Sequence, residues 1–190
     1  MLLCDVTIKE FILAIHTMID LETLDAKPSS TILTLGAVKF NPHTFDDPTQ
    51  ELYIKLDIDE QDALGRTTSE STIDWWMKQD PKIQEDAFSE TGRVGITQAL
   101  SQLTKYCITS DVIWAHGYGF DMTILEDLYR QVKLPIPWNF WQIRDSRTLF
   151  AMLPEDPRKS MQSDLHNALA DAYYQAKGVQ MAYQQLNIKK

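Results

Sequence analysis

A four-residue segment in the middle of the chain constrains the fold most. Val112-Ile113-Trp114-Ala115 is wholly apolar and lies between polar residues, which is typical of a short strand buried on both faces of a sheet. A turn with two glycines follows, and residues 122–132 then have the pattern of a helix. A buried strand that passes through a tight turn into a helix indicates an α/β protein.

Three earlier segments complete the predicted sheet. Residues 16–21 are expected to form the first strand, and residues 32–40 and 51–56 an antiparallel hairpin with a long connection. Because strands come first and strands and helices then alternate, we expect an α/β fold with a mixed central sheet flanked by helices.

Helices are predicted at five places. One begins with Ser71 as its N-cap and Asp74 in the first turn, and it ends before Pro81. The others are residues 95–106, the turn-to-helix segment 122–132 already named, a short helix after residues 144–148 that ends near Pro154, and residues 167–186. Residues 154–163 are expected to be a polar loop. The acidic cluster at residues 57–62 lacks the glycine and glutamate of a calcium-binding loop, and is predicted to be a solvated turn.

Length and composition limit the organisation of the chain. At 190 residues a single domain is expected, with residues 17–190 as that domain and residues 1–16 as an N-terminal arm or short helix. Cys4 and Cys107 are too few for a disulfide framework or a zinc site, so a reducing cytoplasm is the simplest expectation. No stretch is long and apolar enough to span a membrane.

The net charge limits the kinds of function that are plausible for this chain. A formal charge of −9 argues against a protein that grips long tracts of nucleic acid through its phosphates. It does not argue against a nuclease that holds only a chain end, because metal-binding carboxylates contribute to the negative total.

Two acidic residues end the first predicted strand. In the segment Asp20-Leu21-Glu22-Thr23 the two acids are spaced i, i+2, so on a strand both point to the same side of the sheet. Like charges held this close are unfavourable unless a positive charge lies between them, and a divalent metal ion is the obvious candidate. An isolated Asp-x-Glu is more often the start of a polar turn.

Further chemistry-bearing residues lie at other strand and helix boundaries. Asp121 follows the central strand, and His166 and Asp171 flank the start of the last helix. Taken singly, Asp121 reads as a helix cap, His166 as a structural histidine and Asp171 as an exposed acid. Together with Asp20 and Glu22 they predict one cleft at the carboxyl edge of the sheet, where open α/β sheets bind ligands.

These residues carry a resemblance to a known family. Asp20-Leu21-Glu22-Thr23, Phe120-Asp121 and His166-x-x-x-x-Asp171 match, in order, the three motifs of the DEDD superfamily of 3′–5′ exonucleases, in its variant with a histidine base. Residues 70–76, 138–148 and 166–172 resemble the branch of exonuclease A of T-even phages, prophage exodeoxyribonuclease VIII-like proteins and mycobacterial-type 3′ exoribonucleases. The resemblance implies a ribonuclease H-like fold.

The resemblance also implies a mechanism. Two Mg²⁺ or Mn²⁺ ions would be held by four carboxylates, and a histidine would act as general base; these catalytic residues are Asp20, Glu22, Asp121, Asp171 and His166. Independently, ligands that are all oxygens select such hard cations over zinc. The expected substrate is the 3′ end of single-stranded nucleic acid, DNA before RNA, with 5′-mononucleotides as product. A bacterial or phage-infected cytoplasm and a homodimer are also consistent with the relatives.

Four residues are candidates for substrate binding: Leu21, Thr23, Trp76 and Phe120. Thr23 is as readily explained by a hydrogen bond within its own turn. Adjacent helical residues project about 100° apart, so one of Trp75 and Trp76 is expected in the core and the other on the surface, where aromatics stack on bases. For Phe120 the core is favoured.

Two basic residues near this set have a local alternative to substrate. Arg144 and Arg147 are candidates for phosphate contacts, although Asp145 between them, which we expect to be structural, offers each a local ion pair.

Three other functions compete with DNA degradation. The nearest alternative is the same hydrolysis with RNA as the substrate, because no feature of the sequence distinguishes ribose from deoxyribose. A non-catalytic binding module would be expected to have lost a metal carboxylate, and all four are present. A glycosidase that uses Asp20 and Glu22 would leave the other acids unexplained.

Overall fold

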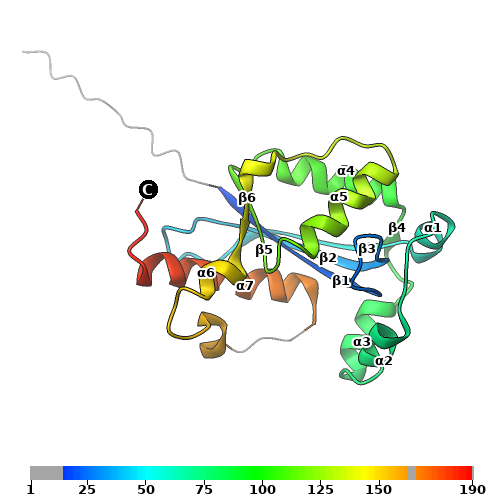
Figure 1. Ribbon diagram of the computed structural model, residues 1–190, viewed down its shortest axis with the longest axis horizontal. Helices are drawn as coiled ribbons and strands as arrows, with labels where there is room; N and C mark the ends of the chain where they lie inside the picture. Colours follow the sequence, from blue (N-terminus) through cyan, green and yellow to red (C-terminus); the bar gives the residue numbers. More distant parts are fainter. Residues whose placement is uncertain (1–14, 162–165, 190) are drawn as a thin grey trace, which may run out of the picture.

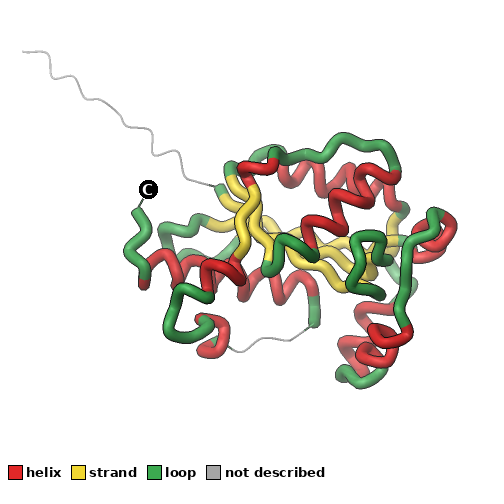
Figure 2. Tube along the Cα trace, viewed as in Figure 1, coloured by secondary structure: helices red, strands yellow, loops and turns green. Residues whose placement is uncertain are grey.

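The computed structural model describes residues 15–161 and 166–189. They form a six-stranded mixed sheet in the order β4-β3-β2-β1-β5-β6, with helices on both faces (Figures 1 and 2). The elements are β1 (His16–Thr23), β2 (Ile32–Phe40), β3 (Thr49–Leu56), α1 (Ile58–Ala63), α2 (Glu70–Trp76), α3 (Pro81–Phe88), β4 (Arg93–Val94), α4 (Ile96–Cys107), β5 (Val112–Ala115), α5 (Asp121–Gln131), β6 (Ile143–Asp145), α6 (Ser146–Phe150) and α7 (Ala168–Gln185), with short 3₁₀ helices η1 (Phe140–Gln142) and η2 (Pro157–Ser160). The predicted α/β fold with a mixed sheet is confirmed.

The sheet combines an antiparallel and a parallel half. β1, β2 and β3 pair antiparallel, whereas β5 runs parallel to β1, and β6 parallel to β5. β1 is therefore a central strand, and its carboxyl end lies on the same side as the end of β5. The two segments that carry predicted acids, at the end of β1 and after β5, are neighbours for this reason.

Alternate residues of β1 face different layers. Ile19 and Leu21 belong to the larger core cluster, which also contains residues of α4 and α5. Met18 packs on the other face with α7. Figure 1 shows α4 and α5 above the sheet and α6 and α7 below it. Asp20 and Glu22 share the parity of Met18, so their side chains lie on the face that α7 covers.

The start of α7 touches the sheet because β2 carries a glycine there. Gly36 lies directly opposite Asp20 in the β1–β2 ladder, and a Cβ at Gly36 would collide with the backbone of Ala168 and Leu169. The buried side of α7 continues with small residues. Gly36 thus allows the first turn of α7, which includes Asp171, to lie against β1.

The pair α2–α3 is anchored at the carboxyl end of β1. Trp76 is fully buried in a small cluster with Leu24, Leu33 and Ala87, and its indole N–H donates to the carbonyl of Thr23 at 2.9 Å. This fixes α2 beside the residues that follow Glu22.

Several local predictions from the sequence were wrong. Ser69, not Ser71, is the N-cap of α2. The acidic cluster at 57–62 is not a turn but helix α1, because the Asp57 side chain caps it by accepting the N–H of Glu60. Not predicted at all were α3, β4, β6, η1 and η2, of which η2 lies in the segment expected to be a loop.

Two further predictions concern the chain ends and membranes. The predicted arm lies outside the described residues except for Ile15 and His16, and His16 is the first residue of β1. Within the described part of the chain, no helix has both the length and the apolar character needed to cross a membrane.

Candidate active site

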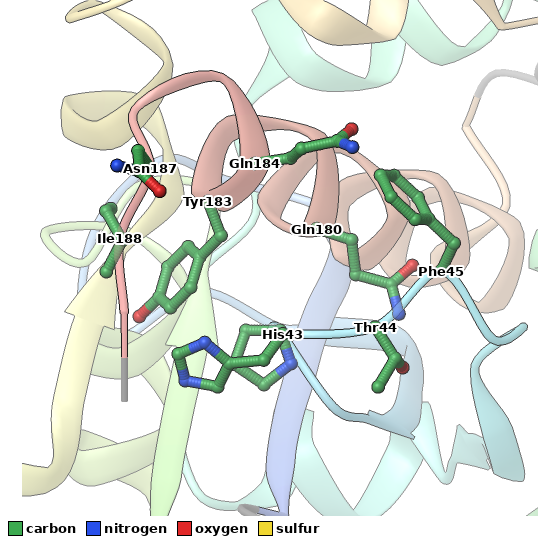
Figure 3. A pocket seen from close by; sticks show the side chains of 9 residues that line it. His43, Thr44, Phe45, Gln180, Tyr183, Gln184, Asn187 and Ile188 are labelled. Carbon is green, nitrogen blue, oxygen red and sulfur yellow. The ribbon is translucent and has the colours of Figure 1, made fainter.

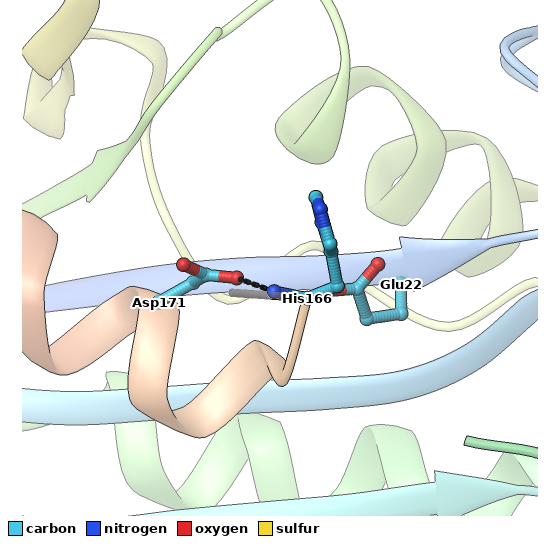
Figure 4. Close-up of side chains that lie close together, drawn as sticks. All are labelled: Glu22, His166 and Asp171. Carbon is cyan, nitrogen blue, oxygen red and sulfur yellow. Dashed lines mark hydrogen bonds between the residues drawn. The ribbon is translucent and has the colours of Figure 1, made fainter. Parts of the chain in front are cut away.

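Three of the predicted site residues meet where β1 and α7 touch. A ligand atom from each of Glu22, His166 and Asp171 lies within 4.8 Å of the others. Glu22 comes from the end of β1, whereas His166 and Asp171 come from the segment before α7 and from its first turn (Figure 4). Residues more than a hundred positions apart in the sequence therefore form one cluster.

Asp121 reaches the same cluster from α5. It is the first residue of that helix, after a turn in which Gly117 has a φ of 136°, a conformation that favours glycine. The Asp121 carboxylate accepts the N–H of Leu21 at 3.2 Å, between the two acids of β1. The N–H of Leu21 is therefore already hydrogen-bonded, and its side chain is buried. Neither group is free to contact a nucleotide, in contrast to the prediction that Leu21 binds substrate.

Burial and mutual repulsion shape the electrostatics of these carboxylates. Burial, then repulsion from Asp121, Glu22 and Asp171, raises the pKa of Asp20 well above its ordinary value. Burial followed by the charges of Asp171 and Asp121 raises the pKa of Glu22 to about 8.

The other two carboxylates are shifted in the same direction. Burial raises the pKa of Asp121 to about 7, against hydrogen bonds that lower it. Burial also raises the pKa of Asp171, although the N–H of His166 opposes this. Among the described residues, no lysine or arginine forms an ion pair with any of the four. A cation would relieve this repulsion, so the oxygen-rich set fits a divalent metal.

His166 is held by its backbone and by an aromatic neighbour. Its φ is 69°, a left-handed conformation that is costly for a residue with a side chain. Its N–H donates to the Asp171 carboxylate at 2.9 Å (Figure 4). The Trp75 ring meets the imidazole edge to face, with ring centroids 4.7 Å apart. The imidazole therefore has a defined place beside the carboxylates.

The structure corrects the choice between the two tryptophans. Trp76, put forward as a nucleotide contact, is 0% exposed and its indole is committed to Thr23, so it cannot stack on a base. Trp75 is 39% exposed and lies next to His166. The surface aromatic of this pair is Trp75.

The remaining substrate candidates have structural contacts. The hydroxyl of Thr23 is buried and donates to the carbonyl of Asp25 at 2.9 Å, as in the alternative of a turn hydrogen bond. Phe120 is half-buried and packs against the larger core cluster. Neither contact identifies a nucleotide site.

One positioning side chain was missed by the sequence. Gln175, 4% exposed, donates its amide N–H to Asp20 Oδ1 at 2.7 Å, and its Oε1 has no hydrogen-bond partner within the described residues. Gln175 lies four residues after Asp171, so both are on the same face of α7. That spacing was the only signal in the sequence.

Of the two candidate arginines, one borders the site. Arg147 donates to the carbonyl of His116 at 3.0 Å, and its charge lowers the pKa of Asp121. Arg144 instead binds the carbonyl of Trp141 at 2.6 Å. Asp145 caps α6 by accepting the N–H of Arg147, in line with the structural role expected for it.

A hollow elsewhere on the molecule contains none of the predicted residues. It measures about 200 Å³ and lies between the segment after β2 and the last turns of α7, where His43 and Tyr183 face each other (Figure 3). Tyr183 is twelve residues beyond Asp171, which is roughly 18 Å along a helix. The carboxylate cluster remains the candidate active site.

Comparison with known proteins points to nucleases. A family model described as the 3′-5′ exoribonuclease Rv2179c-like domain matches residues 15–183. The exodeoxyribonuclease of Enterobacteria phage T4 is 27% identical over 157 residues, which cover 69% of this chain and 68% of the phage protein.

Solved structures share the fold at low identity. The nuclease domain of 3′hExo, a DEDDh family member bound to rAMP, superposes with a TM-score of 0.57 at 15% identity, covering 92% of this chain and 94% of that one. E. coli exonuclease I in complex with a dT13 oligonucleotide superposes with a TM-score of 0.62 at 12% identity. The match covers 92% of this chain and 41% of the exonuclease I chain.

Proposed function

Because the chain belongs to the family of 3′-5′ exoribonuclease Rv2179c-like domains, within the DEDD exonuclease superfamily, we propose that it is a metal-dependent 3′–5′ exonuclease. The observation that carries this proposal is the convergence of Glu22, His166 and Asp171 within 4.8 Å, joined by Asp121 through its bond to the strand between Asp20 and Glu22. We also propose that residues 17–190 form one exonuclease domain, which the family match over residues 15–183 supports.

The proposed metal ligands are the carboxylates of Asp20, Glu22, Asp121 and Asp171. They are crowded, largely buried and raised in pKa, which is the environment that a divalent cation stabilises. We propose two Mg²⁺ or Mn²⁺ ions, which when bound acidify the attacking water and stabilise the leaving oxygen.

The proposed general base is His166. Its imidazole takes a proton from the attacking water, whose oxygen forms a new bond to phosphorus while the bond from phosphorus to the 3′-oxygen of the preceding nucleotide breaks. The leaving 3′-oxygen takes a proton from solvent, so the products are a 5′-mononucleotide and a chain shortened by one nucleotide with a free 3′-hydroxyl. The bond from the His166 N–H to Asp171 at 2.9 Å supports this role, because it holds the base next to the carboxylates.

The proposed substrate is a single-stranded 3′ end. The exposed ring of Trp75 beside His166 offers a stacking surface, and unpaired bases bind to such surfaces. DNA is the first candidate polymer, because the phage relative is an exodeoxyribonuclease. RNA is the second, favoured by the description of the family model as an exoribonuclease domain.

The test is cleavage of matched single-stranded DNA and RNA oligonucleotides labelled at the 5′ end. A descending ladder that requires Mg²⁺ or Mn²⁺, stops in EDTA and is absent in Asp171→Ala and strongly reduced in His166→Ala is expected. Asp59→Ala is the matched control, because Asp59 is an exposed acid of α1, and it should retain full activity. Near-normal turnover by purified Asp171→Ala or His166→Ala would overturn the proposal, and the polymer cleaved identifies the substrate.

A further inference from the structure

The pair α2–α3 approaches the segment that carries His166 from two sides. From α2, the Trp75 ring packs against the imidazole at 4.7 Å. From α3, the carboxylate of Asp86 accepts a hydrogen bond from the side-chain amide of Asn167 at 2.9 Å. Asn167 directly follows His166, so both contacts act on the same short segment.

Asp86 is itself fixed by strand β3 of the sheet. Its carboxylate accepts the hydroxyl of Tyr53 at 2.6 Å and pairs with the ammonium of Lys55 at 2.8 Å. Lys55 also donates to the backbone carbonyl of Asp86 at 2.6 Å. Since Tyr53 and Lys55 lie on β3, Asp86 connects the sheet to the start of α7.

Asn167 has a role at each end of its amide. Its Oδ1 accepts the N–H groups of Leu169 and Ala170 at 3.1 and 3.0 Å and so caps α7. The cap leaves the amide NH₂ free to donate to Asp86. The orientation of Asn167 is therefore determined at both ends of the amide.

This determines where His166 lies. His166 has a φ of 69°, and a residue with a side chain keeps such a conformation only where its surroundings hold it. If Asn167 turned, the backbone of His166 would be released on its carboxyl side.

We propose that Asp86 is a positioning residue for His166: by binding the amide of Asn167 it holds the general base in its reactive place. This inference rests on the proposed function, because it assumes that His166 is the base. Among the described residues, Asp86 forms no hydrogen bond or ion pair with Asp20, Glu22, Asp121 or Asp171; its partners are Tyr53, Lys55 and Asn167.

A matched control exists in another part of the molecule. Asp47 also accepts a tyrosine hydroxyl and a lysine ammonium, those of Tyr173 at 3.0 Å and Lys177 at 3.1 Å, and it makes no described contact with the segment of His166. Asp86→Asn and Asp47→Asn therefore remove the same charge from the same kinds of partner, although the Asp47 side chain is 76% exposed and that of Asp86 41%.

The first experiment compares kcat, KM and Tm in these two variants. Asp86→Asn replaces one of the two carboxylate acceptors with an amide donor, which must face either the donor of Asn167 or the ammonium of Lys55. Because either arrangement disturbs the contacts that hold Asn167, kcat should fall about ten-fold, since small displacements of a catalytic group cost at least this much, while KM stays within about two-fold. Asp47→Asn should leave kcat unchanged and should lower Tm less, because its carboxylate is more exposed. Equal kcat values in the two variants would overturn the inference.

A double-mutant cycle separates positioning from general stability. In a His166→Ala background there is no base to position, so Asp86→Asn should change the residual kcat by less than about two-fold. If Asp86→Asn lowers kcat equally in both backgrounds, the effect is structural and the inference is wrong. If His166→Ala alone has full activity, the proposed function fails, which is a different result.

Exchanging donor and acceptor provides a rescue test. Asn167→Asp keeps a capping oxygen for α7 but loses the donor to Asp86, so it should also lower kcat. Combining Asn167→Asp with Asp86→Asn restores a hydrogen bond of reversed direction, and kcat should recover to within about three-fold of the wild-type value. A double variant that is no better than the worse single variant would contradict the inference.

Discussion

Some side chains outside the proposed metal ligands affect the orientation and ionisation of those ligands. Gln175 is the simplest case. Its amide donates to Asp20 at 2.7 Å, which opposes the rise in the pKa of that carboxyl. Hydrogen bonds of this kind orient metal ligands and favour their ionised form. If Asp20 binds a cation as proposed, Gln175 is placed to orient its carboxylate.

Gln175→Leu should weaken metal binding without unfolding the protein. Asp20 loses the donor that orients it, so the affinity for Mn²⁺ should fall roughly ten-fold, in the range observed when such supporting partners are removed. Titration calorimetry of the purified variant measures this. Gln184→Leu, an exposed position of the same helix, serves as the control, and equal Mn²⁺ affinities in the two variants would show that Gln175 has no such role.

The adjacent tryptophans should respond to mutation in opposite ways. Trp75→Ala removes an exposed ring beside His166, and the loss of one stacked base, about 1–3 kcal/mol, should raise KM roughly ten-fold or more with little change in Tm. Trp76→Ala removes a fully buried ring and should lower the free energy of unfolding by about 3–5 kcal/mol. Oligonucleotide kinetics and thermal melts distinguish the two effects. Trp141→Ala, at an exposed position in η1, controls for general surface effects, and an unchanged KM in Trp75→Ala would rule out stacking.

At the scale of elements, the approach of α7 to the sheet makes the site possible. Glycine is the only residue type that fits at position 36, because any Cβ there would collide with the backbone of Ala168. Gly36→Ala should push the start of α7 away from β1, which costs about 1–3 kcal/mol or more through overpacking and moves Asp171 away from Glu22. Both Tm and kcat should fall. In Gly119→Ala, where a Cβ would meet nothing within 4 Å, Tm should not change; a similar Tm in both variants would mean that α7 adapts without cost.

Elements with a strong internal pattern were predicted well from sequence. β2 and β5 were expected with the bounds that they have, and α5 and α7 within about two residues, since their apolar periodicity is set by burial. The 95–106 helix corresponds to α4 in the same way. The shortest elements were not predictable. β4 and β6 have two and three residues and exist only through pairing with β3 and β5.

Two missed helices had local signals with more than one meaning. Pro81 was taken only as the end of α2, yet it is also the first residue of α3, a position where proline is favoured. The acids after Asp57 resemble a solvated turn, whereas Asp57 is in fact an N-cap. Capping competes with turn formation for the same residue types.

The members of the candidate site were predictable to different degrees. The five residues predicted to be catalytic were chosen from their motifs. The structure brings Glu22, His166 and Asp171 together and places Asp121 against the strand between Asp20 and Glu22, whereas their catalytic role stays a prediction. Whether Trp75 or Trp76 faces the surface depends on how α2 packs, which its sequence leaves open. Gln175 and Asp86 depend on contacts across 155 and 81 positions of the chain, so no local pattern identifies them.

At the scale of the whole molecule, repulsion among the carboxylates of the candidate site destabilises the fold, and a bound cation should offset that repulsion. The chain carries a net charge of −9, and four of its carboxylates are packed together with raised pKa values. A group whose pKa is higher in the folded than in the unfolded protein stabilises the fold below its unfolded pKa, and that contribution is lost as pH rises through the folded pKa. The metal-free protein should therefore become less stable as the pH rises.

The window for this effect follows from the individual groups. The pKa of Glu22 is raised to about 8 and that of Asp121 to about 7, so the loss extends into neutral pH. Burial lowers the pKa of His16 and His116 to about 4, and such groups contribute stability that is lost as pH falls below their unfolded value of about 6.5. Above that pH His16 and His116 release only the protons that their imidazoles still hold in the unfolded protein, and this is a smaller change than the proton release of the raised carboxylates, so the carboxylates determine the sign of the slope.

Thermal melts from about pH 6.5 to about 8.5, in EDTA and in saturating Mg²⁺, test this balance. In EDTA, Tm should fall as pH rises, and Asp121→Asn should flatten the slope because one of the titrating groups is gone. Mg²⁺ should raise Tm at every pH, because it binds the folded state. The gain should be largest at the highest pH, where the carboxylates have lost their protons and the cation alone offsets their repulsion. A gain that is independent of pH would mean that Mg²⁺ binds elsewhere, and a Tm in EDTA that rises over this range would mean that the four carboxylates do not titrate as a repelling cluster.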